Sequence, residues 1–459
     1  MTQKPKDSFA ERSRQSLMRR ANAARLALAA RAVRPAAPRA TGATDFLTLP
    51  GYGDVRVYQR IADLLGISNP FFRLHEGRAS AETQIGGRAL VNFSSYDYLG
   101  LNGHPAVAAA AKAAIDRYGI SSSASRCVGG ERPVHLRLER AIADHYGVES
   151  AVAFVSGYAT NVGVIGQLVG PKDLVVLDSV IHNSAVIGGV LSTANRRSFP
   201  HNDLDALDEL LRQHRGKFER ALIVVEGVYS MDGDYPDLPR LIEIKRRHEA
   251  WLMVDEAHAL GVLGKTGHGL AEHFGVEGSA VDIWMGTLSK TLAACGGYIA
   301  GSEELVYYLK NFVGAFVYSV AMPPSIAAAA EAALACMHQE PERVERLQSN
   351  AAFFLRAARA RGLDTGSAAG TAVSPIIAGD SLPAVFVSEA LFRRGFNVLP
   401  IIYPAVPAKA ARLRFFVSAM HSESDIERAL DATVEEMAAA IERMSTLRLP
   451  DISALQGTG

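Results

Sequence analysis

The sequence predicts an α/β protein with a mostly parallel central sheet, helices on both faces of that sheet, and a smaller C-terminal α/β domain. Short apolar runs typical of buried strands alternate with segments of helical length, which is the pattern of a parallel sheet with helical crossovers. Near residue 325 this alternation gives way to a long Ala-rich segment. The chain of 459 residues is long enough for about two to three domains.

The elements follow from the apolar runs in order along the chain. We predict buried strands over residues 151–155, 174–177, 222–225, 252–254 and 283–285. Helical segments include residues 203–214 and 238–248, and in the C-terminal region residues 326–338 and 424–443. We therefore expect an N-terminal segment over residues 45–104, a large domain over 105–325 and a small C-terminal domain over 326–459.

The composition excludes several classes of protein. Hydrophobic residues make up 48% and charged residues 21% of the chain, which is ordinary for a globular protein. Its three cysteines are too few for a disulfide-stapled scaffold and lack the paired spacing of a zinc site. No apolar stretch is long enough to span a membrane. We expect a cytoplasmic protein in a reducing compartment, with no metal site.

The charge is unevenly distributed along the chain. Residues 1–44 hold ten Lys and Arg residues and two acidic residues, so this segment carries a formal charge of +8 and the remainder −8. A mildly acidic body argues against a nucleic-acid binder. Three interpretations stay open for the basic segment: a solvated extension with a linker, a dock for an acidic partner or the inner membrane surface, and an organelle-targeting peptide.

Small and polar residues follow the first two predicted strands, where ligands of such sheets bind. The turn SGYATN at residues 156–161 opens a helix, and its Gly157 lets the backbone approach an anion such as phosphate. The ring of Tyr158 is suited to stack on a flat ligand. Such a turn is also common in ordinary strand–helix connections. His182 follows the second strand, where a structural role is the alternative.

Acidic and basic side chains follow the later strands. Residues 226–233 (EGVYSMDG) follow the third strand, and Asp255 and His258 follow the fourth. A carboxylate at a buried strand end needs a partner, and the protonated nitrogen of a pyridine cofactor is one natural choice, with a metal pair as the alternative. Lys290 follows the fifth strand among small residues, which makes it a candidate Schiff-base nucleophile or else a surface lysine.

The order of these motifs is that of pyridoxal-phosphate enzymes of the aspartate-aminotransferase fold, fold type I. Over about residues 60–445 the sequence resembles the α-oxoamine synthases, and within them most closely the serine palmitoyltransferases. The matching segments are NFSSYDYLGL (92–101), SGYATN (156–161), EGVYSMDG (226–233), VDEAHALG (254–261), GTLSK (286–290), GGYIAG (296–301), and residues 403–407 with 412–421. Two departures from the family pattern are Tyr96, where most members have Asn, and Asn183 in place of Ala.

The resemblance implies pyridoxal 5'-phosphate as cofactor. It implies that Lys290 forms the Schiff base with the cofactor and that Asp255 pairs with the nitrogen of the cofactor's pyridine ring. His258 would contact the ring oxygen and His182 would stack on the ring. These four are the implied catalytic residues. The resemblance further implies Gly157, Tyr158 and Thr287 around the phosphate, Arg414 and Tyr96 at the substrate, and Ser230 at the cofactor or the substrate carboxylate. Ser319 would reach the phosphate of the neighbouring subunit in a homodimer with shared sites.

The resemblance also implies the reaction, a C-acyltransferase condensation with loss of CO₂. We expect a small amino acid, with L-serine favoured, and a long-chain acyl thioester carried by coenzyme A or acyl carrier protein. The product would be a 2-amino ketone of the 3-ketosphinganine type, made in the first step of sphingolipid synthesis. The alternative is another α-oxoamine synthase that uses glycine or alanine with a different acyl thioester. A silent partner subunit and an aminotransferase are the other candidates.

Overall fold

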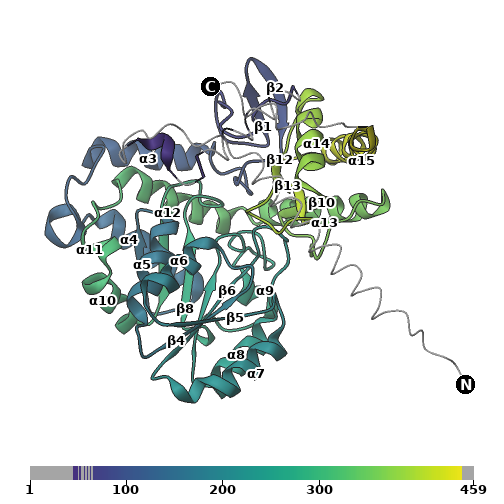
Figure 1. The fold of residues 1–459 in the computed structure, drawn as a ribbon. Helices are drawn as coiled ribbons and strands as arrows, with labels where there is room; N and C mark the ends of the chain where they lie inside the picture. Colours follow the sequence, from purple (N-terminus) through teal and green to yellow (C-terminus); the bar gives the residue numbers. More distant parts are fainter. Residues whose placement is uncertain are drawn as a thin grey trace, which may run out of the picture.

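The computed structural model describes residues 45–49, 51–52, 56, 59, 63 and 66–446. Its centre is a seven-stranded sheet in the order β3-β9-β8-β7-β6-β4-β5 (Figure 1). Strand β9 is antiparallel to its neighbours β3 and β8, and the remaining strands are parallel to one another. The strands are β3 Ser150–Phe154, β4 Leu174–Asp178, β5 Asn195–Phe199, β6 Ala221–Glu226, β7 Trp251–Asp255, β8 Ile283–Thr287 and β9 Gly297–Gly301.

Helices lie on both faces of this sheet because successive strand residues point to opposite sides. Leu174, Val176 and Ile223 belong to one apolar cluster with α4, α7, α8 and α12, whereas Val175 and Leu222 belong to the other with α5, α6 and α10. The helices of this part are α3 Pro105–Tyr118, α4 Pro133–Tyr146, α5 Gly157–Leu168, α6 Asn183–Leu191, α7 Leu204–His214, α8 Leu238–Arg247, α9 Leu270–Phe274, α10 Glu303–Phe312, α11 Gly314–Val317 and α12 Pro324–Gln339.

A second, smaller layer packs beside the sheet (Figure 1). Its antiparallel sheet has the order β10-β13-β12, and the hairpin β1–β2 is extended by parallel pairing of β2 with β11. A third apolar cluster joins these strands to three helices. The elements are β1 Glu82–Ile85, β2 Arg88–Asn92, β10 Val373–Gly379, β11 Phe396–Asn397, β12 Leu399–Ile401, β13 Ala411–Phe416, α13 Glu342–Ala360, α14 Ser381–Arg393 and α15 Glu423–Thr446.

The predicted fold class is confirmed, and each of the five predicted strands overlaps a strand of the central sheet. Strands β5 and β9 were not predicted from apolar runs. The predicted domain boundaries stay a prediction. Helix α12 begins beside the predicted boundary at residue 325, and its Ala327 and Met337 lie in the same large apolar cluster as Val107 of α3. The interpretations of residues 1–44 concern a segment outside the described residues.

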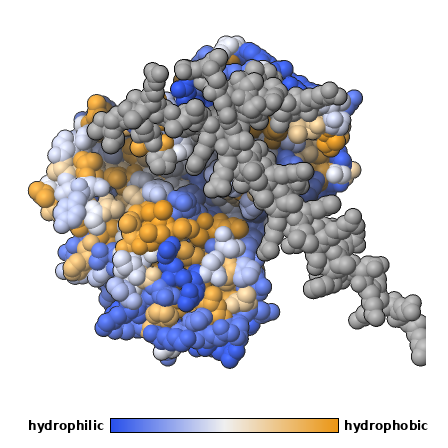
Figure 2. Space-filling model, viewed as in Figure 1, coloured by the Kyte–Doolittle hydropathy of each residue, from blue (hydrophilic) through white to orange (hydrophobic). Residues whose placement is uncertain are grey.

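The surface seen in Figure 2 is polar along the edge where α7 and α8 lie. Ion pairs join these two helices, with Arg240 3.5 Å from Asp205 and Arg247 2.6 Å from Asp208. Within the part of the chain that the structure describes, no helix has both the length and the apolar character needed to cross a membrane.

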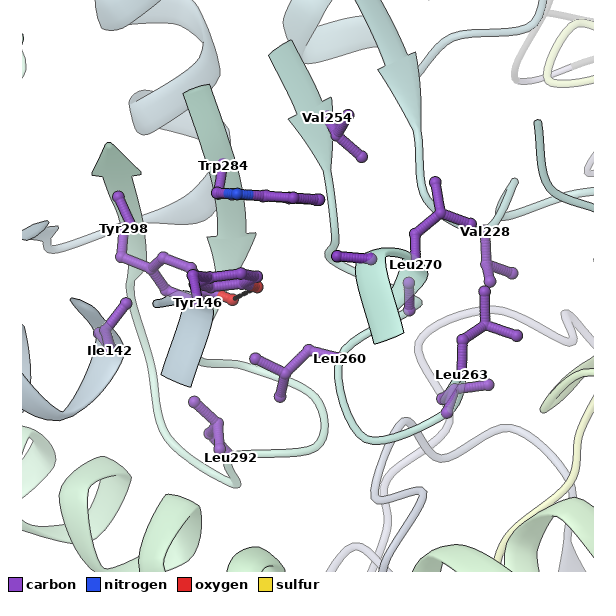
Figure 3. Packing of buried hydrophobic residues seen from close by; sticks show 14 of the residues in the cluster. Ile142, Tyr146, Val228, Val254, Leu260, Leu263, Leu270, Trp284, Leu292 and Tyr298 are labelled. Atoms are coloured by element: carbon purple, nitrogen blue, oxygen red, sulfur yellow. Dashed lines mark hydrogen bonds between the residues drawn. The ribbon is translucent and has the colours of Figure 1, made fainter. Parts of the chain in front are cut away.

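Aromatic packing behind β8 fixes the strand that leads to Lys290. The rings of Trp284 on β8 and Tyr146 on α4 stack with their centroids 5.1 Å apart (Figure 3). The Tyr146 hydroxyl is hydrogen-bonded at 2.7 Å to the hydroxyl of Tyr298 on β9. Tyr298 is fully buried and pairs with Gly286 of β8, so its ring lies against the strand where Gly286 has no side chain.

We predict that Gly286→Ala destabilises the protein by about 1–3 kcal/mol, because the added Cβ would overlap the buried Tyr298 phenol. Gly216→Ala is the matched control, since no atom lies within 4 Å of a Cβ built there. Urea unfolding midpoints of the two variants and the parent protein measure the difference. Equal midpoints for Gly286→Ala and the parent protein would contradict the packing described.

Candidate active site

The carboxyl ends of β6, β7 and β8 bring charged residues together at one edge of the sheet. Glu226 ends β6 and Asp255 ends β7, and the two are cross-strand neighbours in the parallel register. Lys290 follows β8 by three residues, and its charge interacts with both carboxylates. Because the strands are parallel, residues distant in sequence meet here.

The pKa of Lys290 is lowered, as expected of a reactive amine. Burial lowers its pKa to about 8; the carboxylates of Asp255 and Glu226 oppose this shift, and the guanidinium of Arg414 adds to it. Its Nζ lies 5.7 Å from the centroid of the Tyr96 ring and makes no hydrogen bond or ion pair with any other described residue. A lysine that loses its proton this readily is able to act as a nucleophile or a base near neutral pH.

Asp255 is buried, with its carboxylate held by two donors. Its Oδ2 accepts a hydrogen bond from Asn161 Nδ2 at 2.8 Å, and its Oδ1 accepts one from the backbone N–H of Ala257 at 3.0 Å. The neighbouring Glu226 accepts bonds from the backbone N–H groups of His182 at 2.7 Å and Ser230 at 3.2 Å. Burial, and then the charge of Asp255, raise the pKa of Glu226 to about 8.

Tyr98 orients His258. Its fully buried hydroxyl is hydrogen-bonded at 2.7 Å to His258 Nδ1. Burial, with the cations of Lys290 and Arg414, lowers the pKa of His258 well below its usual value, so this ring is neutral. Sequence reasoning missed this role of Tyr98, because its partner is 160 positions away and an apolar context gives no signal of a polar contact.

His182 lies at the N-terminus of α6 as its N-cap residue. Its Nδ1 is 2.7 Å from Ser184 Oγ and accepts a weak bond at 3.3 Å from the Ser184 backbone N–H. Burial lowers the pKa of His182; the charge of Asp255 opposes the shift, and the cations of Lys290 and Arg414 reinforce it. A neutral imidazole at the edge of the site results.

The N-terminus of α5 forms a small cradle against β8. Gly157 is the first helical residue, and a Cβ built there would lie 2.9 Å from Thr287 Oγ1. Only glycine therefore leaves room in the cradle without a shift of Thr287, whose hydroxyl donates to the Gly296 carbonyl at 2.9 Å. Tyr158 follows, with half of its surface exposed. Free N–H groups and the helix dipole favour an anion here.

The smaller layer contributes Arg414 from β13. Its Nη1 donates to the Ser230 carbonyl at 3.0 Å, and its buried Nε has no hydrogen-bond partner among the described residues. Ser230 is itself buried, and Tyr96 is partly exposed beside His258. Ser319 follows α11 and makes no hydrogen bond or ion pair with the other predicted residues in the described part of the chain.

A group of three histidines lies elsewhere in the structure and has ligand atoms close enough to consider a metal: His145, His268 and His338. Their rings are nearly parallel, at 4–9°, and His145 Nδ1 faces His338 Nε2 at 3.0 Å. Two ring nitrogens at this distance are within hydrogen-bonding range when one of them carries a proton. This geometry matches a hydrogen-bonded stack.

Known proteins resemble this chain over most of its length. Residues 88–432 match the family model for class I and II aminotransferases. The 8-amino-7-oxononanoate synthase of Geobacter sulfurreducens is 44% identical over 348 residues, 75% of this chain and 88% of that enzyme. The enzyme of the same name from Symbiobacterium thermophilum is 38% identical over 391 residues, covering 85% of this chain and 96% of its own length. The solved serine palmitoyltransferase of Sphingomonas wittichii is 30% identical with a TM-score of 0.82, covering 87% of this chain and 100% of its own.

Fold and site together define a fold type I pyridoxal-phosphate enzyme of the class I and II aminotransferase type. The chain belongs to the α-oxoamine synthase family within that type, and it is an enzyme of the C-acyltransferase kind.

The predicted preference for serine and a long acyl chain, and with it the place in sphingolipid synthesis, is wrong. Relatives that are 38–44% identical are named 8-amino-7-oxononanoate synthase, whereas the serine palmitoyltransferase structures are 29–30% identical. The physical reason is that the motifs used for the prediction surround the cofactor, which the whole family shares. The motifs therefore identify the family and do not distinguish serine from alanine.

The residues present fit pyridoxal phosphate, the cofactor of this family. The N-terminus of α5 offers backbone N–H groups to a phosphate, and any side chain at position 157 would crowd Thr287 there. Asp255 is a buried acceptor suited to a protonated ring nitrogen, and Lys290 Nζ has no other bonded partner in the described chain.

We predict that Tyr98→Phe lowers kcat about fivefold, because His258 loses a hydrogen bond worth about 1 kcal/mol while the ring still fills its buried site. Tyr308→Phe is the control, since that hydroxyl bonds Gln167 in an exposed position. Steady-state kinetics and cofactor absorbance of both variants give the result. A folded Tyr98→Phe with parental kinetics would rule out the positioning role.

Proposed function

We propose that this enzyme condenses alanine with the thioester of a seven-carbon dicarboxylic acid to form 8-amino-7-oxononanoate. The observation that supports it is the shared name of the relatives at 38–44% identity. That name fixes the substrates chemically: carbons 8 and 9 with the amino group come from alanine after loss of CO₂, and carbons 1–7 come from the diacid. This reaction is the predicted alternative to serine condensation, with its amino acid now specified.

Asp255 and Lys290 carry the proton chemistry in this proposal. Pyridoxal phosphate, when bound, supplies an electron sink for the negative charge that develops at the amino-acid Cα. Asp255 keeps a proton on the ring nitrogen, and the N–H donors of Asn161 and Ala257 hold its carboxylate in place. Lys290 removes the Cα proton, a step helped by a pKa near 8.

Arg414 binds the carboxylate of the incoming amino acid in this proposal. Its unpartnered Nε and its position beside Ser230 support the assignment. Tyr96 borders the same space, next to Lys290 and His258. A carbon–carbon bond then forms between Cα and the acyl carbon as the carbon–sulfur bond breaks, and the thiolate takes up a proton to leave as the thiol. The carboxylate leaves as CO₂, and Cα takes up a proton in its place, so the proton that Lys290 removed and one from solvent balance the reaction.

The active enzyme is proposed to be a homodimer in which Ser319 reaches the phosphate bound by the other copy. Support comes from exposed apolar side chains around Ser319, among which Tyr318 is 89% and Val320 51% exposed. Ile120 and Val128 are similarly exposed, at 77% and 84%. Apolar surface of this extent is typical of an interface with another chain.

We predict that alanine is used at least about tenfold more efficiently than serine or glycine with the seven-carbon diacid thioester, because each differs by one group in a fitted pocket. Product mass and CO₂ release measure the preference, with coenzyme A and acyl carrier protein compared as thioester carriers. Preference for serine with a palmitoyl thioester would contradict the proposal. Amino-group transfer to a keto acid without CO₂ release would also contradict it.

A further inference from the structure

Asn161 on α5 connects Asp255 at the end of β7 with Ser184 on α6. Its Nδ2 donates to Asp255 Oδ2 at 2.8 Å and to Ser184 Oγ at 2.9 Å. Asn161 and Ser184 are each only 1% exposed. Ser184 in turn contacts His182, so four side chains form one chain of hydrogen bonds that runs from the buried Asp255 to the exposed residue His182.

The carboxylate of Asp255 decides the orientation of the Asn161 amide. Both oxygens of Asp255 act as acceptors, Oδ1 from the Ala257 N–H and Oδ2 from Asn161, so the side of the amide that faces Asp255 is the NH₂ group with its two N–H donors. The second N–H then points to Ser184 Oγ, which accepts. Asn161 Oδ1 has no partner among the described residues, whereas the reversed amide would press that oxygen against the carboxylate.

The direction continues from Ser184 to His182. With one lone pair occupied by Asn161, the Ser184 hydroxyl has its own proton available for His182 Nδ1, 2.7 Å away. The backbone N–H of Ser184 points at the same nitrogen from 3.3 Å. A proton on Nδ1 would face this second donor, so Nδ1 acts as the acceptor.

We propose that Asn161 and Ser184 are positioning residues that hold His182 as the neutral tautomer with its proton on Nε2. Nε2 lies on the ring edge that is not tied to α6 and makes no hydrogen bond within the described residues, so its N–H is available to a substrate oxygen. The lowered pKa of His182 agrees with a neutral ring. The inference rests on the proposed role of His182 in the site and not on the choice of alanine.

The tautomer is measured directly in the holoenzyme labelled with ¹⁵N-histidine. A long-range ¹H–¹⁵N spectrum at neutral pH distinguishes protonated from unprotonated ring nitrogens, and the His182→Gln variant identifies the His182 signals. We expect an unprotonated Nδ1 and a protonated Nε2, with or without bound cofactor. A proton on Nδ1, or on both nitrogens, would overturn the proposal.

Ser184→Ala tests the cause of the tautomer. Removing the hydroxyl is expected to move the His182 signals toward a mixture of tautomers and to lower kcat about three- to tenfold. Ser184→Thr keeps a hydroxyl, so we expect it to restore both the His182 tautomer signals and the parental kcat. The matched control is Ser192→Ala at the other end of α6, where a buried hydroxyl donates to Gly189.

An unchanged tautomer in folded Ser184→Ala would show that the hydrogen-bond chain does not set it, and would also overturn the proposal. The spectra are independent of which amino acid the enzyme prefers. Failure of the alanine assay and failure of this inference are therefore separate results.

Discussion

The site depends on keeping two carboxylates and one lysine buried together at the carboxyl edge of the sheet. Burying a charge is costly unless it is paired or hydrogen-bonded. Asp255 and Glu226 together accept hydrogen bonds from four N–H donors, and their charges partly offset the desolvation of Lys290. This arrangement leaves Lys290 with a pKa of about 8 near the hydrogen-bonded Asp255 carboxylate, which is the combination that pyridoxal-phosphate chemistry requires.

The fold supplies each donor from a different element, so the arrangement holds only in the folded chain. Asn161 comes from α5, the His182 N–H from the turn before α6, and the Ser230 N–H from the loop after β6. Arg414 approaches from the smaller layer and contacts that same loop through Ser230. Arg414 and Glu226 therefore bond the same residue of this loop, Ser230.

Much of the fold and the family membership could be predicted from the sequence, because buried parallel strands are continuous apolar runs followed by their functional residues. β5 was missed because it is an edge strand with the sequence NRRSF and three exposed residues, and β9 because its glycines weaken the strand signal. The roles of Tyr98, Asn161 and Glu226 depend on contacts across 44 to 160 positions, which local patterns do not encode. The substrate was mispredicted because relatives named for different substrates both match this chain, so the motifs identify the family and not its amino acid.

The central claim is that Lys290 is the amine that binds pyridoxal phosphate covalently. Reducing the holoenzyme with borohydride and mapping its peptides tests this claim most directly, because the reduced cofactor stays attached to the lysine that held it. The account predicts label on Lys290 in the parent enzyme and no label in a folded Lys290→Ala variant. Label on another lysine, or equal labelling of the variant, would contradict it.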